Sequence, residues 1–210
     1  LLCFSAAAVT SITDTSGHWA ESHIEKWVND GLIAGYPDGQ FKPDHPITRA
    51  ELVALVNRAF EIPDQTPASS FSDVKPSDWF YGEVMSGYAA GYIAGYPDGA
   101  FRPDIPITRQ EAASLVSKLL GLEPGETSVL DSFTDQNLVE GWAKSGVSGV
   151  IAHGIMSGFP DKTFGPQKNI TRAETVVTLD KALACAPEKI SGIQGIVKRD
   201  NQPVEGATVR

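Results

Sequence analysis

The chain has 210 residues, of which 41% are hydrophobic and 20% charged, and its formal net charge is −9 with a pI of about 4.9. This length suffices for one or two domains with a hydrophobic core. The acidic balance excludes a non-specific nucleic-acid binder, which needs a basic face, and no stretch is apolar for long enough to span a membrane.

The opening residues predict export. Residues 1–8 end in Ala6-Ala7-Ala8, a run of small residues typical of a cleavage site, and we interpret them as the remnant of a secretory signal peptide. Cleavage there would leave Cys185 as the remaining cysteine, so no internal disulfide is expected. We therefore expect a secreted protein that is not inserted in a membrane after signal cleavage.

One plan then repeats three times, and we place the units at 9–62, 63–123 and 124–186. Each unit is predicted to hold two helices around a turn, because apolar residues recur at helical spacing on both sides of a stretch rich in Gly and Pro. In chain order, the expected helices span about 19–29, 48–60, 79–90, 108–120, 139–153 and 171–184. The predicted fold class is therefore mainly α, with linkers at 61–70 and 121–131.

The turn reads Gly-Tyr-Pro-Asp-Gly at 35–39 and at 95–99, but Gly-Phe-Pro-Asp-Lys at 158–162. Pro presets φ in such a turn and Gly can supply a positive φ. Lys162 stands where the other units have glycine, and a positive φ there would cost lysine about 1 kcal/mol. Unit three also has Gly165 where the other units carry Lys42 and Arg102, so we expect sites that involve unit three to differ most.

Each second helix is predicted to begin at a capping box. Thr is followed three residues later by Glu in Ile-Thr-Arg-x-Glu, just before an apolar run. The hydroxyl is expected to accept from the backbone N–H of the glutamate, whose carboxylate reaches back to the threonine N–H. The capping pairs are Thr48 and Glu51, Thr108 and Glu111, and Thr171 and Glu174.

An arginine occupies the first helical position of all three capping boxes, as Arg49, Arg109 and Arg172. Capping does not explain it, because a positive charge at a helix N-terminus is mildly unfavourable. A guanidinium beside free helix N–H groups is well suited to bind a carboxylate. We therefore favour a ligand role, with a purely structural role as the alternative.

The character of the sequence changes after residue 186. Residues 191–197 alternate like a strand, a turn follows, and 204–209 begin another strand. Two strands do not make a stable domain, so we expect residues 187–210 to be the truncated start of a β-domain. This tail resembles the opening of carboxypeptidase-regulatory-like β-sandwich modules.

A Trp-led helix, the turn Gly-Tyr-Pro-Asp-Gly-x-Phe-x-Pro-Asp and the helix start Ile-Thr-Arg-x-Glu, repeated about every sixty residues, together resemble the S-layer homology (SLH) domain. The resemblance covers roughly residues 12–184. It implies three tandem helix–loop–helix repeats in a pseudo-threefold assembly, with ligand grooves between neighbouring units. It further implies a module that is secreted to the bacterial cell surface, cell wall or S-layer, with no catalytic role, cofactor or metal.

The implied partner is a secondary cell wall polysaccharide attached to peptidoglycan, and in many family members the recognised end is N-acetylmannosamine carrying a pyruvate ketal. The expected ligand-binding residues are the Arg and Thr of the motif and the Gly and aromatic residue of the turn. They are Arg49, Arg109, Arg172, Thr48, Thr108, Thr171, Gly35, Gly95, Gly158, Tyr36, Tyr96 and Phe159, while Glu51, Glu111 and Glu174 are structural caps. Core packing is the alternative for the three aromatic residues of the turn.

Two further expectations concern residues beside the motif. Trp19, Trp79 and Trp142 open the three units, and we expect them to pack against neighbouring helices. Gln110 replaces the alanine of the motif in unit two, where we expect it to matter little because it lies on a helix surface.

Three other classes of function compete with anchoring. An exported hydrolase needs two carboxylates facing one cleft, but the acidic residues here fall mostly in turns and caps. A calcium loop needs oxygen ligands at alternating positions, where the segment 38–44 places Phe41 and Lys42 instead. A self-assembling S-layer protein, or the anchoring part of an exported polysaccharide-degrading enzyme, remains an alternative, and we expect this chain to be monomeric.

Overall fold

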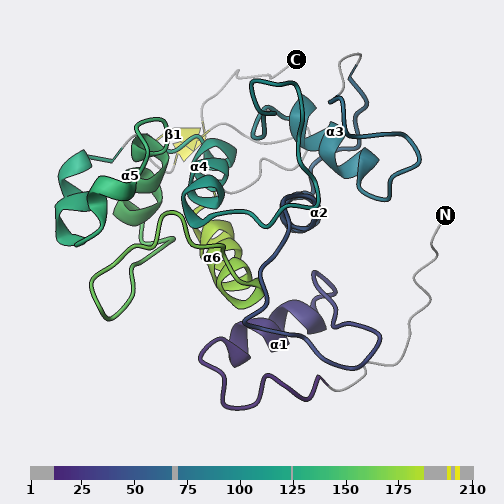
Figure 1. Ribbon diagram of the computed structural model, residues 1–210, viewed down its shortest axis with the longest axis horizontal. Helices are drawn as coiled ribbons and strands as arrows, with labels where there is room; N and C mark the ends of the chain where they lie inside the picture. The colour runs from purple at the N-terminus through teal and green to yellow at the C-terminus, as the bar shows by residue number, and fades with distance from the viewer. Residues whose placement is uncertain (1–11, 68–70, 124, 187–197, 200–201, 204–210) are drawn as a thin grey trace.

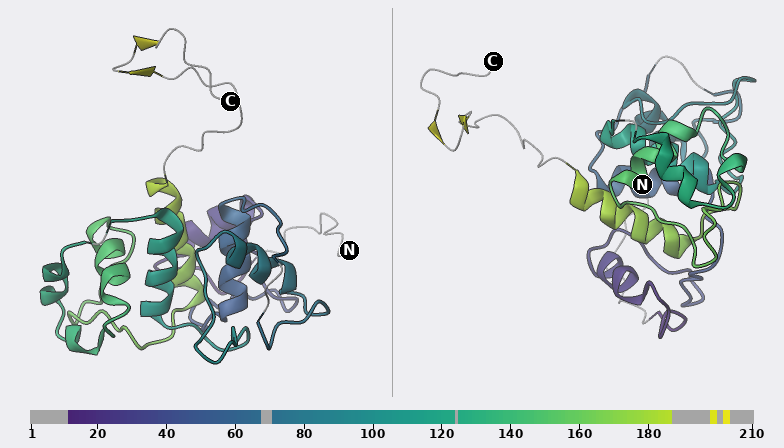
Figure 2. Two further views of the ribbon diagram at one scale, coloured as in Figure 1. Left: turned by 90° about the horizontal axis from the view of Figure 1, so that it is seen from above. Right: turned by 90° about the vertical axis from the view of Figure 1, so that its left-hand side faces the viewer.

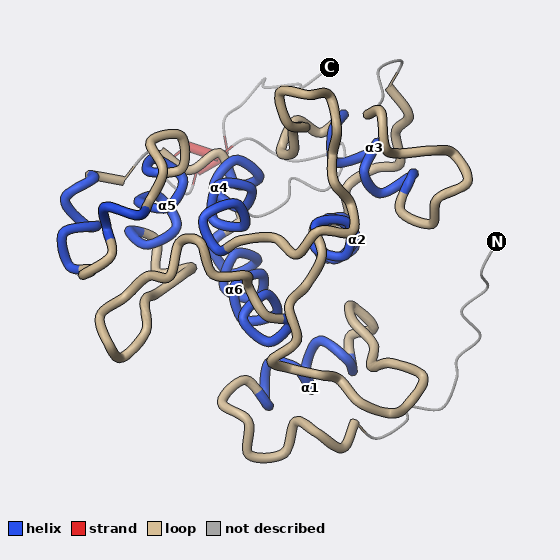
Figure 3. Tube along the Cα trace, in the orientation of Figure 1, coloured by secondary structure: helices blue, strands red, loops and turns tan. Residues whose placement is uncertain are grey.

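The computed structural model describes residues 12–67, 71–123 and 125–186, together with the backbone of 198–199 and 202–203. It is mainly helical, as predicted (Figures 1 and 3). The paired helices of the units are α1 (Glu21–Asn29) and α2 (Arg49–Ala59), α3 (Tyr81–Ala89) and α4 (Arg109–Leu120), and α5 (Lys144–Ala152) and α6 (Arg172–Cys185).

Unit three departs from the expected helix boundaries. Its first helix, α5, begins at Lys144 rather than near residue 139, because the chain first forms a short 3₁₀ helix, η2 (Gln136–Leu138), and then turns extended at Val139. A second 3₁₀ helix, η1 (Thr127–Ser132), occupies much of the predicted linker, where Leu130 is buried. The linker prediction was therefore wrong for this segment.

The six α-helices pack in a closed ring. The first helix of each unit lies against the second helix of the unit before it: α3 packs on α2, α5 on α4, and α1 on α6. Figure 2 shows α2, α4 and α6 standing side by side at the centre, with the loops that carry the motifs gathered at one end. The contact between α1 and α6 joins the first unit to the last.

Three isoleucines of the motif form a cyclic hydrogen-bond pattern between the units. The backbone N–H of Ile47 donates to the carbonyl of Ile170 (3.1 Å), that of Ile170 to Ile107 (3.0 Å), and that of Ile107 to Ile47 (3.1 Å). All three side chains are buried. Because each unit donates to one neighbour and accepts from the other, the pseudo-threefold arrangement is fixed by the backbone itself.

An aspartate anchors each motif loop, and sequence reasoning did not assign it this role. Asp14 accepts from the N–H groups of Phe41 and Lys42, both at 2.7 Å. Asp73 and Asp135 do the same in units two and three. Burial raises the pKa of Asp14, but these backbone hydrogen bonds lower it by more, so the pKa lies below its ordinary value. The anchored phenylalanines Phe41, Phe101 and Phe164 are fully buried.

Two positions of the motif loop have a positive φ in every unit. Lys162 has φ 62°, as Gly39 and Gly99 have 80° and 81°, which confirms that lysine takes a conformation favoured by glycine. At the second position the roles are exchanged, because Lys42 and Arg102 have φ 58° and 61° while Gly165 has 68°. Each motif loop thus has one non-glycine residue in the left-handed region.

The predicted β-domain lies largely outside the described residues. A short antiparallel pair is seen between β1 (Lys198–Arg199) and β2 (Gln202–Pro203). Residues 1–8, interpreted as a signal-peptide remnant, also lie outside the described part. Among the described helices, none has the length and apolar character needed to cross a membrane.

Candidate functional site

Each motif arginine reaches out of its own unit into the motif loop of the next. From α2, Arg49 donates through Nε to the carbonyl of Phe101 (2.9 Å) and pairs through Nη1 with Glu111 Oε1 (3.3 Å). Its Nη2 lies 3.5 Å from the carbonyl of Ala94. The phenol of Tyr96 donates to the same Glu111 oxygen (2.6 Å). The first arginine is therefore held between a helix cap and a loop of unit two.

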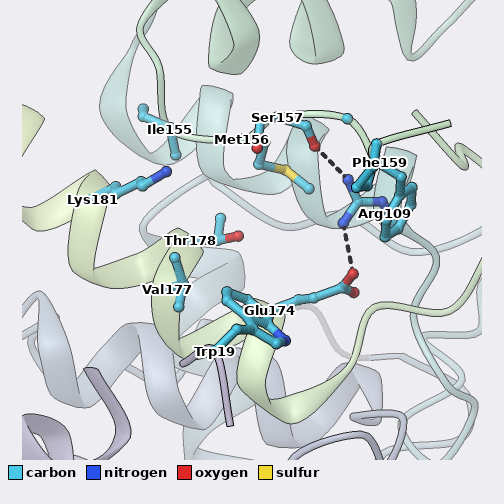
Figure 4. Close-up of a pocket in the computed structure, with 12 residues that line it drawn as sticks. Trp19, Arg109, Ile155, Met156, Ser157, Phe159, Glu174, Val177, Thr178 and Lys181 are labelled. Atoms are coloured by element: carbon cyan, nitrogen blue, oxygen red, sulfur yellow. Dashed lines mark hydrogen bonds and ion pairs between the residues drawn. The ribbon is translucent and has the colours of Figure 1, made fainter. Parts of the chain in front are cut away.

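The same construction recurs between units two and three. Figure 4 shows Arg109 donating to the carbonyl of Ser157 (2.8 Å) and paired with Glu174 (3.2 Å). Its Nε donates to the carbonyl of Phe164 (2.8 Å). Burial lowers the pKa of the Arg109 guanidinium, and Glu174 counteracts this effect.

Arg172 closes the cycle by reaching from unit three back to unit one. It donates to the carbonyls of Phe41 (2.9 Å) and Ala34 (3.0 Å). Among the described residues no ion pair joins Arg172 to Glu51, although this glutamate corresponds to Glu111 and Glu174. The third junction therefore differs from the other two in its charge pairing.

Two aromatic rings flank every motif arginine. Arg109 lies 4.5 Å from the ring centroid of Phe159 and 4.9 Å from that of Phe164, and the other two arginines have the corresponding ring pairs. The arginines are 4–9% exposed, and such stacking favours a guanidinium. The half-buried rings of Tyr36, Tyr96 and Phe159 therefore have a packing role.

Two cavities lie where the arginines meet the loops. One, of about 430 Å³, is lined by Arg109, the loop 155–160, the α6 face and Trp19 of unit one (Figure 4). The other, of about 1200 Å³, runs along α4 and is lined by Arg49, the loop 92–97 and Trp142. Both cavities thus combine residues from all three units, including a buried cation and an exposed indole.

The expectation that the tryptophans pack into the molecule was wrong. Trp19, Trp79 and Trp142 are 62%, 63% and 57% exposed. The neighbouring residues Ala20, Phe80 and Ala143 are buried in their place. Trp19 and Trp142 instead line the two cavities. The sequence did contain a signal for this exposure: in each unit the tryptophan is followed directly by a small or apolar residue that can fill the core in its place.

The glycines that begin the turns have a packing reason of their own. A Cβ on Gly95 would lie 2.7 Å from the ring of Phe71, and one on Gly158 would collide with Phe133. On Gly35 it would lie 3.0 Å from the carbonyl oxygen of Gln40. Gly95 and Gly158 also line the cavities, so packing and ligand approach are compatible roles for them.

The threonines and glutamates form the expected capping boxes in all three units. Thr48, Thr108 and Thr171 each accept from the backbone N–H of the glutamate three residues later. Of these, Thr108 also lines the larger cavity. Two of the glutamates, Glu111 and Glu174, have a second role that sequence reasoning missed, because they pair with the arginine of the preceding unit.

The expectation for Gln110 was also wrong. Its side chain is 3% exposed, and its amide donates to Glu140 Oε1 (3.0 Å) and accepts from the Glu140 backbone N–H (3.1 Å). The residue faces the entry to α5 rather than solvent, because α5 packs along this side of α4. In the described part of the chain, no group of three or more His, Cys, Asp and Glu side chains is arranged to hold a metal ion.

The sequence of the chain matches the model of the S-layer homology domain three times, over residues 11–53, 70–113 and 132–176. The chain belongs to the S-layer homology domain family. This confirms the family predicted from the motifs, and each match spans the first helix and motif loop of one unit and ends in the first turns of its second helix.

Relatives of the SLH repeats include both surface proteins and an enzyme. The chain is 34% identical over 161 residues to a cellulosome-anchoring protein of Acetivibrio thermocellus, covering 74% of this chain and 36% of the relative. It is 31% identical over 182 residues to the surface-layer 125 kDa protein of Lysinibacillus sphaericus, covering 85% and 15%. The match to an amylopullulanase of Thermoanaerobacterium thermosulfurigenes is 32% over 172 residues, covering 80% and 9%.

The chain therefore spans about a third or less of these relatives, and what they share with it is the SLH region. Repeats of this family occur in S-layer proteins, in an anchoring protein and in enzymes, and they are anchoring rather than catalytic units. The cell-surface location predicted from the motifs agrees with the surface proteins among the relatives.

Proposed function

We propose that this chain is a non-catalytic module that anchors an exported protein to the bacterial surface by binding a secondary cell wall polysaccharide. The observation that carries the proposal is the pairing, in each of the two cavities, of a buried arginine with an exposed tryptophan. An indole face offers the apolar surface on which a sugar ring stacks, and a guanidinium offers directed donors for an acidic substituent.

The charge chemistry favours a carboxylate-bearing sugar. A guanidinium has five N–H donors, and Arg109 uses three contacts within the protein, which leaves donor capacity for a ligand. The net charge of −9 would repel a diffuse polyanion, whereas a single carboxylate can bind at one fixed site. Among carboxylate-bearing sugars, we propose the group that the family resemblance implies, a pyruvate ketal on N-acetylmannosamine at the end of the polysaccharide.

Catalysis is not assigned to the three repeats. The glutamates nearest the arginines are engaged as helix caps and ion-pair partners, so they lack the freedom of an acid and base facing one cleft. A polysaccharide-degrading activity or an S-layer lattice would belong to other parts of a longer protein, as the relatives named for such roles are much longer than this chain.

Calorimetric titration with pyruvylated and unpyruvylated N-acetylmannosamine glycosides tests the proposal. We expect binding of the pyruvylated glycoside and at least about tenfold weaker binding of the other, since a charge-assisted hydrogen bond contributes about 1.5–3 kcal/mol. Trp19→Ala should weaken binding, whereas Leu138→Ala should not, because Leu138 is also exposed but lies outside both cavities.

Sedimentation with cell-wall sacculi tests the anchoring function independently of the identity of the terminal sugar. Binding to sacculi that keep their secondary polysaccharide, and loss of binding after hydrofluoric acid removes it, would support anchoring whatever the terminal sugar is. Equal sedimentation with stripped sacculi would contradict the proposal.

A further inference from the structure

The larger cavity contains a carboxylate held in place by two neutral donors. Glu140 Oε1 accepts from the side-chain amide of Gln110 (3.0 Å), and its Oε2 accepts from the indole N–H of Trp142 (2.7 Å). All three residues line the cavity along α4. Gln110 is buried on α4 and Glu140 is exposed, so the carboxylate is joined to this helix through Gln110 and to the indole through the Trp142 N–H.

This arrangement belongs to one groove only of the three that the repeat could form. The residue two before the tryptophan is Gly17 in unit one and Ser77 in unit two, where unit three has Glu140. The position of Gln110 is occupied by Ala50 and Ala173 in the other second helices. The carboxylate and the residue that positions it therefore occur together, and Trp19 in the smaller cavity has neither.

The negative charge of Glu140 is not balanced within the protein. Among the described residues no ion pair includes Glu140. Its partners are an amide and an indole, which hold the carboxylate without neutralising it. Lys118 also lines the cavity, but its place on α4 is about 12 Å along the axis from Gln110. An unbalanced carboxylate at the edge of an indole, whose face stays free to stack, is an arrangement that attracts an ammonium group.

We propose that the α4 groove selects a sugar carrying an unacetylated amino group, with Glu140 pairing with the ammonium, Trp142 stacking on the ring, and Gln110 positioning both. This inference rests on the proposed function and specifies the ligand of one groove. The net charge of −9 favours a cation at this site. With Arg49 lining the same cavity, the groove suits a saccharide that carries both a carboxylate and an amine.

The test compares two defined oligosaccharides by calorimetry on the whole chain: the tetramer of glucosamine and the tetramer of N-acetylglucosamine. At about pH 6, below the pKa of an aliphatic amine, we expect the glucosamine tetramer to bind at least about tenfold more tightly. The preference should shrink as salt is added, because the attraction at an exposed site is screened.

Two variants test whether Glu140 and Gln110 cause the preference for the glucosamine tetramer. Glu140→Gln should abolish the preference between the tetramers without changing the melting temperature. Gln110→Ala should reduce it, since the carboxylate loses one of its two holders. The control is Glu25→Gln, which removes the same charge from an exposed position on α1 outside both cavities and should leave the preference intact.

Equal binding of both tetramers, no binding of either, or a preference that survives Glu140→Gln would overturn this inference. The sacculus sedimentation is run in parallel on the same protein. Binding to polysaccharide-bearing sacculi without any preference between the tetramers overturns the role of Glu140 alone, whereas failure to bind those sacculi overturns the proposed function.

Discussion

Arg109 joins units two and three at the scale of a single side chain. Its guanidinium contacts two carbonyls and Glu174, and the side chain of that glutamate is 14% exposed. An arginine with these contacts stabilises the ring whether or not a ligand is bound, and a ligand carboxylate would share the guanidinium with the glutamate. The structural and ligand roles that the sequence left as alternatives are therefore compatible in one residue.

Replacing Arg109 by alanine should destabilise the fold as well as weaken binding. Removal leaves Glu174 and two carbonyls without their donor, and breaking a buried pair from one side costs about 3–5 kcal/mol. Urea unfolding of Arg109→Ala measures the loss. Arg102→Ala serves as the control, because Arg102 is exposed and its ion pair with Asp98 and its stacking on Tyr96 both lie within its own loop. An unchanged free energy of unfolding in Arg109→Ala would contradict the structural role of the arginine and leave ligand binding as its role.

At the scale of the motif loop, features set by neighbouring residues could be predicted from the sequence, whereas contacts between distant residues could not. The capping boxes were predictable because both partners lie within one helical turn. The partners of the arginines were not, because Arg49 meets Glu111 and Arg172 meets Phe41 only when the ring closes. The exposure of Trp142 depends likewise on how α5 docks on α4, which no local pattern encodes.

The loop anchor Asp14 should make the stability of the fold depend on pH. Its pKa is lowered in the folded protein, so the stability it contributes is present above the unfolded value of about 3.9 and is lost as the pH falls below it. Asp14→Asn should cost about 1–3 kcal/mol at neutral pH, because one backbone N–H loses its acceptor.

Urea unfolding at neutral pH and at about pH 3 checks this anchor. The wild type and Asp14→Asn should differ fully at neutral pH and by less at about pH 3, because the contribution of a carboxylate with a lowered pKa is lost progressively below its unfolded pKa. Asp64→Asn, at an exposed position, should match the wild type throughout. A constant difference between the wild type and Asp14→Asn at both pH values would mean that the anchor does not depend on the charge.

At the scale of the whole molecule, a charged contact between α1 and α6 joins the first and last units, in addition to the hydrogen bonds of Ile47 and Arg172. Asp180 on α6 accepts from Lys26 (2.7 Å), Trp27 (3.1 Å) and His23 (2.8 Å) on α1. The corresponding residues of α2 and α4 are Asn57 and Ser117. Among the described residues, the α1–α6 junction therefore has an ion pair where the α2–α3 junction has a hydrogen bond from Asn57 to Glu83 (2.7 Å). Burial raises the pKa of Asp180, but the hydrogen bonds from Lys26, Trp27 and His23 lower it more.

Asp180→Asn should therefore loosen α1 from α6 while the other two junctions stay closed. Because Trp19 and α6 line the smaller cavity from opposite units, the same change should weaken binding there more than in the α4 groove. Amide hydrogen exchange would show this as faster exchange in α1 than in α3 relative to the wild type. Asp30→Asn removes the more distant partner of Lys26 (3.8 Å) and should leave exchange in α1 unchanged. If both variants exchange alike, the junction is held by the apolar packing of Ile24 and Trp27 rather than by the aspartate.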